Sequence, residues 1–212
     1  MAEGELILRT ATPDDAAAMA GVDRQSWPAA LATSAEGFER RIAAFPEGQL
    51  VAESDGRIVG AAGAQRVTQQ FFDANSRQYD LLTDSDRLSA THDPLGEIYQ
   101  LIGVGVTPEF RGSRLGRQLV DRQIAYARSL PGIERIMGFT RPAGFHKHRD
   151  LPIDEYVVLQ DGNGRHVDPV LAFHVTAGAQ ILSIHSDFRP NDEQSGGYGV
   201  LIEYALRGGD VT

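Results

Sequence analysis

The chain has 212 residues, a length that suits one domain with a sizeable hydrophobic core. Its formal net charge is −9 at pH 7, so it lacks the broad positive field that drives nucleic-acid binding. It contains no cysteine, which excludes disulfides, thiolate metal sites and a cysteine nucleophile.

No stretch of the sequence approaches the roughly 20 apolar residues that a membrane-spanning helix needs. Residues 1–5 are acidic, the opposite of the basic start of a signal peptide. We therefore expect a cytoplasmic protein that associates with neither membranes nor nucleic acids.

The first half of the chain predicts two helices and three strands. A strand over 6–9 precedes a helix that Thr12 caps and that runs to Trp27, and Ser34 caps a second helix. Asp55-Gly56 predicts a tight hairpin turn between strands over 49–54 and 57–64. Residues 68–96 are polar and aperiodic, so we expect an insertion there rather than core structure.

The second half alternates strands and helices. A strand over 98–106 carries two glycines near its end, which indicate a bulge or the close approach of another backbone. A helix with a wide apolar face follows and ends near Pro131-Gly132, and a strand covers 135–140. After a loop-rich segment over 141–166, we predict a short helix over 168–177 and strands over 180–188 and 198–206. Strands and helices mixed in this way predict a single α/β domain of the α+β kind over 1–212.

The most informative segment joins the strand over 98–106 to the long helix. Gly112, Ser113 and Gly116 allow a bulky anion to come close to the backbone at a helix N-terminus, which carries about half a positive charge. Three arginines surround the same turn, at positions 111, 114 and 117. This concentration of cations in an acidic chain predicts a phosphate or pyrophosphate site.

The run Val106-Thr107-Pro108-Glu109-Phe110-Arg111-Gly112, followed by Leu115-Gly116, resembles the acetyl-CoA-binding signature of the GNAT superfamily of N-acetyltransferases. Arg114 stands where that family usually has its second glycine. The stretch from Thr91 to Tyr204 is also similar to the acetyltransferase-like domain fused to carbon-nitrogen hydrolases. The resemblance implies a mostly antiparallel sheet of about six or seven strands, with helices on both faces and a splayed central strand pair.

The resemblance also implies acetyl-CoA as the acyl donor, with no metal. The pantetheine arm would pair with the backbone of Val104, Gly105 and Val106, and an N–H near Val104 would polarise the thioester carbonyl. The pyrophosphate would bind the amides of Arg111, Gly112, Ser113, Arg114, Leu115, Gly116 and Arg117.

Acetyl transfer needs an acid for the leaving thiolate and a base for the attacking amine, and the sequence offers a candidate for each. The family usually carries a tyrosine four residues before the glycine that ends the later helix, and His174 stands there, where an imidazolium is a competent acid for the leaving thiolate. Glu97 is the carboxylate nearest the start of the central strand and is our candidate base. Alternatives are a water held by Tyr99 and Gln100, or the more remote Glu203 and Asp154.

The predicted function is therefore acetyl transfer from acetyl-CoA to a primary amine of a small or amino-acid-like molecule, and the acidic charge balance favours a cationic acceptor. Two alternatives stay open: a non-catalytic module that binds or senses acyl-CoA, and an acyltransferase for longer or carrier-bound acyl groups. The sequence also leaves a homodimer open.

Two smaller features were weighed for function. His146 and His148 form a pair without further ligands at a set spacing, which is weak support for a metal. Trp27, Phe71 and Phe72 are candidates to line an acceptor pocket, although aromatic residues are more often core.

Overall fold

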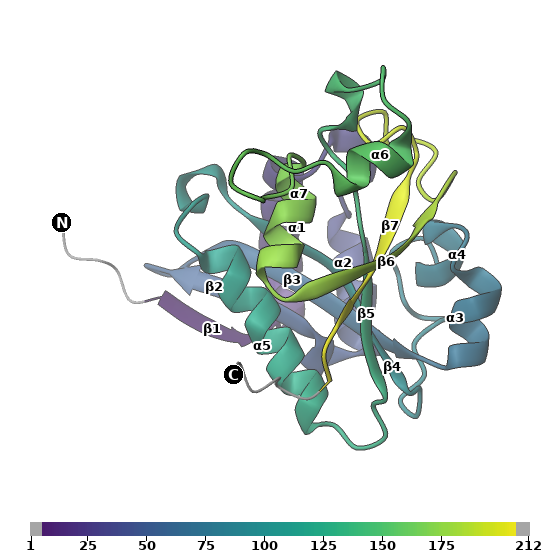
Figure 1. Cartoon of the computed structure of the whole chain (residues 1–212). Helices are drawn as coiled ribbons and strands as arrows, with labels where there is room; N and C mark the ends of the chain where they lie inside the picture. The colour runs from purple at the N-terminus through teal and green to yellow at the C-terminus, as the bar shows by residue number, and fades with distance from the viewer. Residues whose placement is uncertain (1–5, 207–212) are drawn as a thin grey trace, which may run out of the picture.

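Seven strands form one mixed sheet in the order β1-β2-β3-β4-β5-β7-β6 (Figure 1). The computed structural model describes residues 6–206, so the acidic segment 1–5 lies outside the described residues. The strands are β1 Leu6–Thr10, β2 Gln49–Ser54, β3 Arg57–Val67, β4 Ile98–Val106, β5 Arg135–Thr140, β6 Ala179–His185 and β7 Gly199–Tyr204. Neighbouring strands are antiparallel except β4 and β5, which are parallel. The predicted fold class is confirmed.

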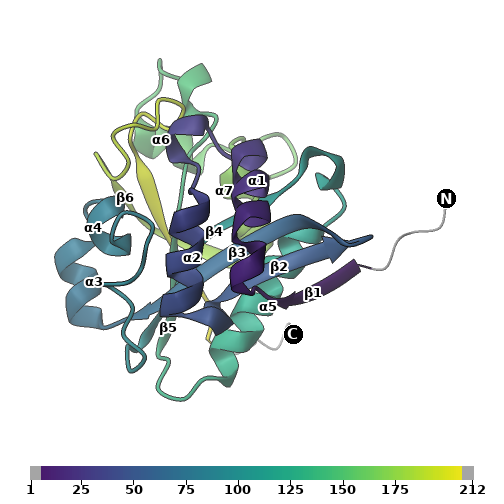
Figure 2. The ribbon, with the colours of Figure 1, turned by 180° about the vertical axis from the view of Figure 1, so that it is seen from behind.

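Helices cover both faces of the sheet. They are α1 Ala16–Ser26, α2 Ala35–Ala44, α3 Gln69–Asn75, α4 Tyr79–Thr83, α5 Leu115–Ser129, α6 Ile153–Val158 and α7 Pro169–Thr176. Figure 1 shows α5 and α7 in front of the sheet, and Figure 2 shows α1 and α2 in front of its other face. None of the described helices is both long and apolar enough to cross a membrane.

The wide apolar face of α5 packs flat on the sheet, as its sequence predicts. Leu115 and Leu119 are buried against β2 and β3, and Val120, Ile124 and Ala127 enter the main core with β5 and β7. Burying side chains of this size contributes roughly 1.5–3 kcal/mol each, which anchors α5 and therefore the loop that precedes it.

The sheet branches in its middle. β4 and β5 pair only from Ile98 to Leu101, opposite Arg135 to Gly138. At that point β4 carries a bulge: Gly63 of β3 faces Gly103 while Ala64 faces Leu101, so Ile102 is the extra residue. A bulge bends its strand and increases its twist, so the rest of β4 follows β3 and leaves β5. The splayed central strand pair is confirmed, and it opens a wedge in the sheet.

The turns predicted from single residues are present. Asp55 and Gly56 have φ of 50° and 72°, the left-handed pair that a tight hairpin turn needs. The side chain of Ser34 accepts a hydrogen bond from the amide of Gly37 and caps α2. Asp168 caps α7, and Gly178 follows that helix with φ of 93°.

Residues 68–96 are more ordered than the sequence predicts, because they contain α3 and α4. Phe72, Tyr79 and Leu82 are buried in a second core cluster with Ile98 and Met137 on the sheet. The helices have 7 and 5 residues, too few turns to produce a periodic apolar stripe. The short helix α6 escaped prediction for the same reason.

Candidate active site

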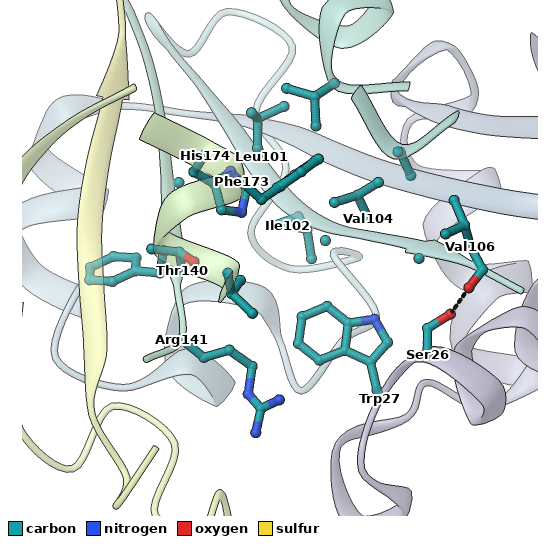
Figure 3. Close-up of a pocket in the computed structure, with 18 of the residues that line it drawn as sticks. Ser26, Trp27, Leu101, Ile102, Val104, Val106, Thr140, Arg141, Phe173 and His174 are labelled. Carbon is teal, nitrogen blue, oxygen red and sulfur yellow. Dashed lines mark hydrogen bonds between the residues drawn. The ribbon is translucent and has the colours of Figure 1, made fainter. Parts of the chain in front are cut away.

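A cavity of about 430 Å³ occupies the wedge between β4 and β5 (Figure 3). Its walls are the splayed half of β4, the end of β5, the C-terminal end of α1, and one side of α7. The residues that line it include Ser26, Trp27, Val104, Thr140, Phe173 and His174. Most of its lining is apolar, so polar groups that face it act in a partly dehydrated environment.

The β4 wall presents backbone groups to the cavity. The amide of Thr107 donates to the carbonyl of Val59 on β3, so the alternation along the strand turns the polar groups of Val104 and Val106 the other way, into the wedge. The hydroxyl of Ser26 donates to the carbonyl of Val106 at 2.9 Å (Figure 3). A pantetheine arm, which has amide groups of its own, fits the pairing positions that remain.

Gly105 allows α1 to approach this wall. A Cβ at this position would lie 2.9 Å from the Ser26 hydroxyl oxygen and 3.0 Å from its Cβ. The interpretation of the two strand glycines therefore holds on both counts: the bulge lies beside Gly103, and the close approach occurs at Gly105.

The turn before α5 has the free amides that an anion site requires. Gly112 and Arg114 have φ of 82° and 67°, and the first turn of α5 leaves the amides of Gly116 and Arg117 without an intrahelical carbonyl. The amides of Arg111 and Ser113 instead donate to Pro108 and Phe110 within the turn. The predicted pyrophosphate site therefore retains its glycines and the N-terminus of α5, but the amides of Arg111 and Ser113 already have hydrogen-bond partners.

The three arginines of this segment have different surroundings. Arg111 lines the cavity and donates to the carbonyl of Gln25 at 2.6 Å. Arg117 pairs with Asp121 at 2.7 Å and donates to the carbonyl of Thr176, which ties α5 to α7. Arg114 is exposed and makes no ion pair among the described residues.

His174 projects from α7 into the cavity (Figure 3). Its Nδ1 lies 2.7 Å from the hydroxyl of Tyr204. Burial lowers the pKa of His174 to about 4 and raises the pKa of Tyr204. The imidazole is therefore neutral at pH 7, and the ready imidazolium acid that we expected is not its resting form. When Tyr204 donates to Nδ1, the other ring nitrogen carries the hydrogen and is a donor.

Thr140, at the end of β5, carries one of three buried side-chain oxygens without a hydrogen-bond partner among the described residues; the others belong to Gln49 and Thr107, neither of which lines the main cavity. Thr140 itself is 4% exposed and lines the cavity. Leaving a buried hydroxyl unpaired costs about 1–3 kcal/mol, so such a group points to a ligand that pairs with it.

Trp27 forms the wall opposite His174 (Figure 3), and two guanidinium groups lie near its ring. The Arg141 guanidinium is 6.0 Å from the ring centre and that of Arg189 is 5.4 Å from it. Arg141 is held by Asp192, with its Nε 2.7 Å from a carboxylate oxygen. Arg189 lies 3.4 Å above the ring of Tyr79 and makes no ion pair within residues 6–206.

Arg189 also lines a small adjoining cavity of about 20 Å³ that shares Trp27, Ile102 and Gly103 with the main one. Asp23 and Arg41 line the same small cavity, and Arg41 pairs with Asp86.

Glu97 lies outside the cavity. It precedes β4, four residues before the branch, and its carboxylate accepts a hydrogen bond from the amide of Gln69 at 2.8 Å. Glu203 pairs with Arg135, also away from the lining. Among the described residues that line the main cavity there is no aspartate or glutamate. The prediction of Glu97 as a base therefore has no support in the geometry.

The aromatic candidates divide in the same way. Trp27 lines the cavity, but Phe71 and Phe72 pack in the second core cluster. No group of three or more residues suited to hold a metal occurs between residues 6 and 206. Thr140 ends β5 and Arg189 follows β6, far apart in the chain and within no local motif, so the sequence alone did not indicate either residue.

The model of the acetyltransferase (GNAT) family matches residues 17–149. A GNAT-like decarboxylase solved in complex with isobutyryl-CoA is 34% identical, with a TM-score of 0.81, over 95% of this chain and 100% of that one. The loading GNATL domain of CurA from Lyngbya majuscula is 27% identical, with a TM-score of 0.86, over 95% of this chain and 98% of that one.

Two curated proteins of Bacillus subtilis are also similar. A probable hydrolase is 25% identical over 95% of this chain, which spans only 39% of that protein's length. An uncharacterized N-acetyltransferase is 28% identical over 84% of this chain and 77% of its own length. With the signature turn, the branched sheet and a family model matching more than half of the residues, the chain belongs to the acetyltransferase (GNAT) family.

Proposed function

We propose that the chain binds an acyl-CoA thioester in the wedge and removes CO₂ from a carboxylated acyl group. The observation that carries the proposal is the charge at the cavity: its mostly apolar lining contains Arg111 and Arg141 but no carboxylate. Beside it, Arg189 lines the adjoining small cavity near Trp27 and makes no ion pair among the described residues. A carboxylate is attracted to such a site, whereas a protonated amine is repelled from it. The relative with isobutyryl-CoA supports the same reaction, since it is described as a decarboxylase.

The arrangement suits the electron flow of decarboxylation. The bond between the carboxylate carbon and the α-carbon breaks, CO₂ leaves, and the electron pair moves into the thioester carbonyl to give an enolate. The α-carbon then takes a proton from water. Stabilising the enolate oxygen requires hydrogen-bond donors already aimed at it, which often contribute about 3–4 kcal/mol each.

Two hydrogen-bond donors and the apolar wall of the cavity suit this reaction. The hydroxyl of Thr140 is buried at the cavity wall and has a hydrogen to donate. The neutral imidazole of His174 is a second donor when Tyr204 donates to its Nδ1. The apolar wall strips water from the carboxylate, and a poorly hydrated carboxylate loses CO₂ more readily.

Direct assay tests this proposal. Malonyl-CoA and methylmalonyl-CoA are incubated with the protein, and the acyl-CoA species are followed by mass spectrometry. We expect conversion to acetyl-CoA and propionyl-CoA, respectively, without net release of thiol. Unchanged thioesters at saturating concentration count against decarboxylation.

The second candidate is the acetyl-CoA-dependent N-acetyltransferase of the sequence prediction. The family match and the similar N-acetyltransferase of Bacillus subtilis favour it. Its assay is free-thiol release from acetyl-CoA with a library of primary amines. Binding without thiol release or decarboxylation would point to the non-catalytic module. Turnover of carrier-bound thioesters alone would point to the acyltransferase for longer or carrier-bound acyl groups.

A further inference from the structure

The segment 68–96 places one aromatic side chain in the small cavity that adjoins the wedge. Tyr79 begins α4, and its amide donates to the carbonyl of Phe188 at 2.9 Å. The rings of these two residues also meet edge to face, with their centres 6.0 Å apart. Figure 1 and Figure 2 both show α4 beside the end of β6. Because Arg189 follows Phe188 directly, α4 is attached to the backbone that carries Arg189.

The guanidinium of Arg189 lies on the face of the Tyr79 ring. Its central carbon is 3.4 Å from the ring centre, which is van der Waals contact for a planar group that lies flat on the ring. An aromatic face attracts the cation without using its N–H groups, whereas a carboxylate partner takes up to two of them. The N–H edge of Arg189 therefore stays available to a ligand on the side of Trp27, whose ring centre is 5.4 Å away.

The other end of the Tyr79 ring is held by a buried ion pair. Its hydroxyl donates to the carboxylate of Asp86, and Arg41 pairs with the same carboxylate. The Nη2 of Arg41 is also 3.4 Å from the Tyr79 hydroxyl, and its Nε donates to the backbone carbonyl of Asp86 at 2.7 Å. Tyr79 and Arg41 are both buried. The phenol oxygen is thus held by two charged groups, which fixes the plane of the ring.

The backbone that carries Asp86 is strained. Asp84, Ser85, Asp86 and Leu88 have φ of 51°, 49°, 72° and 63°, respectively. Residues with a Cβ rarely adopt such values, and the strain persists only where surrounding contacts over-determine it. Here Leu88 is buried in the second core cluster and Asp86 is held by Arg41. The fold therefore keeps the carboxylate that orients Tyr79 in place at a cost in backbone energy.

We propose that Tyr79 is a positioning residue for recognition of a carboxylated acyl group: its ring holds Arg189 with the N–H edge directed at the substrate carboxylate beside Trp27. This rests on the proposed function and gives the segment 68–96 a role in substrate selection. A guanidinium that is already held in one orientation loses less conformational freedom when it binds. Without the ring, Arg189 keeps its charge but is free to adopt several rotamers.

The test measures binding without turnover. In the thioether CoA–S–CH₂–CH₂–COO⁻ a methylene replaces the carbonyl of malonyl-CoA, so CO₂ cannot leave, and S-propyl-CoA is the matched ligand without a carboxylate. Isothermal titration calorimetry of the full chain gives the ratio of the two dissociation constants. We expect the wild type to prefer the carboxylated thioether about tenfold or more, the usual scale of a charge-assisted contact. Tyr79→Leu should abolish most of this preference and leave the affinity for S-propyl-CoA unchanged.

Further variants distinguish positioning from packing. Tyr79→Phe keeps the ring and should retain most of the preference. Leu82→Val removes a buried methylene from the same helix, outside the lining of the small cavity, so it should lower Tm and keep the preference. In an Arg189→Gln background, Tyr79→Leu should have no further effect, because two residues that act through one contact are not additive. If Tyr79→Leu does not fold, Tyr79→Met replaces it, since an unbranched side chain fills irregular space.

Each outcome bears on a different claim. A preference that survives loss of the Tyr79 ring overturns the positioning role and leaves the proposed function standing, and an equal loss of preference in Leu82→Val also overturns that role. A preference that depends on Tyr79 in a chain that does not decarboxylate malonyl-CoA supports the positioning role and removes only the reaction. Equal affinity of the wild type for the two thioethers removes the carboxylate site, and with it both this inference and the charge-based support for decarboxylation.

Discussion

Removing the hydroxyl of Thr140 should affect the reaction but not the stability of the fold. It is buried at the end of β5 with no partner among the described residues, so the isosteric change Thr140→Val removes a group that the fold does not use. We expect the free energy of unfolding in urea to stay the same or rise by about 0.5–1 kcal/mol. If the hydroxyl donates to the enolate, kcat should fall by about 100-fold. Thr140→Ser should restore much of the rate, and a fully active Thr140→Val enzyme would exclude this donor.

The free guanidinium of Arg189 leads to a split between two substrates. Arg189→Gln should raise KM for a carboxylated acyl-CoA by about tenfold or more, because one charge-assisted contact is lost. The affinity for an acyl-CoA without a carboxylate on its acyl group should not change, because the charges of that ligand are its phosphates, which lie at the opposite end of the molecule from the acyl group. Steady-state kinetics and calorimetry measure the two quantities. Arg77→Gln, at an exposed arginine between α3 and α4, is the control, and an equal loss with both ligands would place Arg189 elsewhere in the site.

The low pKa of His174 links the cavity to stability. The imidazole has a pKa of about 4 in the folded chain and an ordinary value near 6.5 when unfolded, so acid protonates the unfolded state first. Its contribution is fully present above pH 6.5 and is lost as the pH falls toward 4, with an upper limit of about 3 kcal/mol. His174→Gln should remove this pH dependence.

Urea unfolding of both chains at several pH values provides the measurement. The pKa values of His92 and His185 are also lowered by burial, and they affect both chains alike. The difference between the two curves therefore isolates His174. Parallel curves from pH 7 to pH 4 would show that the imidazole is not held neutral.

At the scale of elements, the sequence predicts structure where one residue type dictates the backbone. Asp55-Gly56 specified the hairpin, the glycines of β4 indicated the bulge and the close approach, and Gly112 indicated the tight turn before α5. The sequence did not predict helices α3 and α4, because they are short and are stabilised by burial against strands that are distant in the sequence. The site shows the same limit: Thr140 and Arg189 acquire meaning only when β5 and the segment after β6 meet Trp27.

The branch between β4 and β5 depends on one more glycine. A Cβ on Gly138 would lie 3.2 Å from the carbonyl oxygen and 3.3 Å from the Cβ of Leu101, the last paired residue of β4. We expect Gly138→Ala to push the strands apart and to lower the free energy of unfolding by about 1–3 kcal/mol, the range for overpacking. CoA affinity should fall as well.

Gly162→Ala is the control for this variant, because a Cβ there meets nothing within 4 Å. Urea unfolding and calorimetry on the two variants provide the comparison. If Gly138→Ala keeps both stability and CoA affinity, the close packing at the branch does not set the width of the wedge.

At the scale of the whole molecule, positive charge is concentrated near the wedge although the chain as a whole is negatively charged. The chain carries a net charge of −9, yet several arginines lie close to the wedge. Arg111 lines it, Arg114 and Arg117 lie at the α5 turn with Arg165 nearby, and Arg189 lies beside Trp27. Such a local field attracts a highly charged anion in spite of the net charge, and salt screens the exposed part of it over about 8–10 Å.

The wedge leaves the middle of the sheet with backbone groups and a hydroxyl unpaired, so a ligand that fills it should stabilise the entire fold. At a CoA concentration 100 times the dissociation constant, binding adds about 2.7 kcal/mol to the free energy of unfolding. For a domain of this size that corresponds to a rise in Tm of roughly 5–11 °C. Differential scanning calorimetry measures the rise, and Arg111→Ala at the same CoA concentration should show a clearly smaller one. A wild-type Tm that does not respond to CoA at millimolar concentration would mean that the wedge does not hold this ligand.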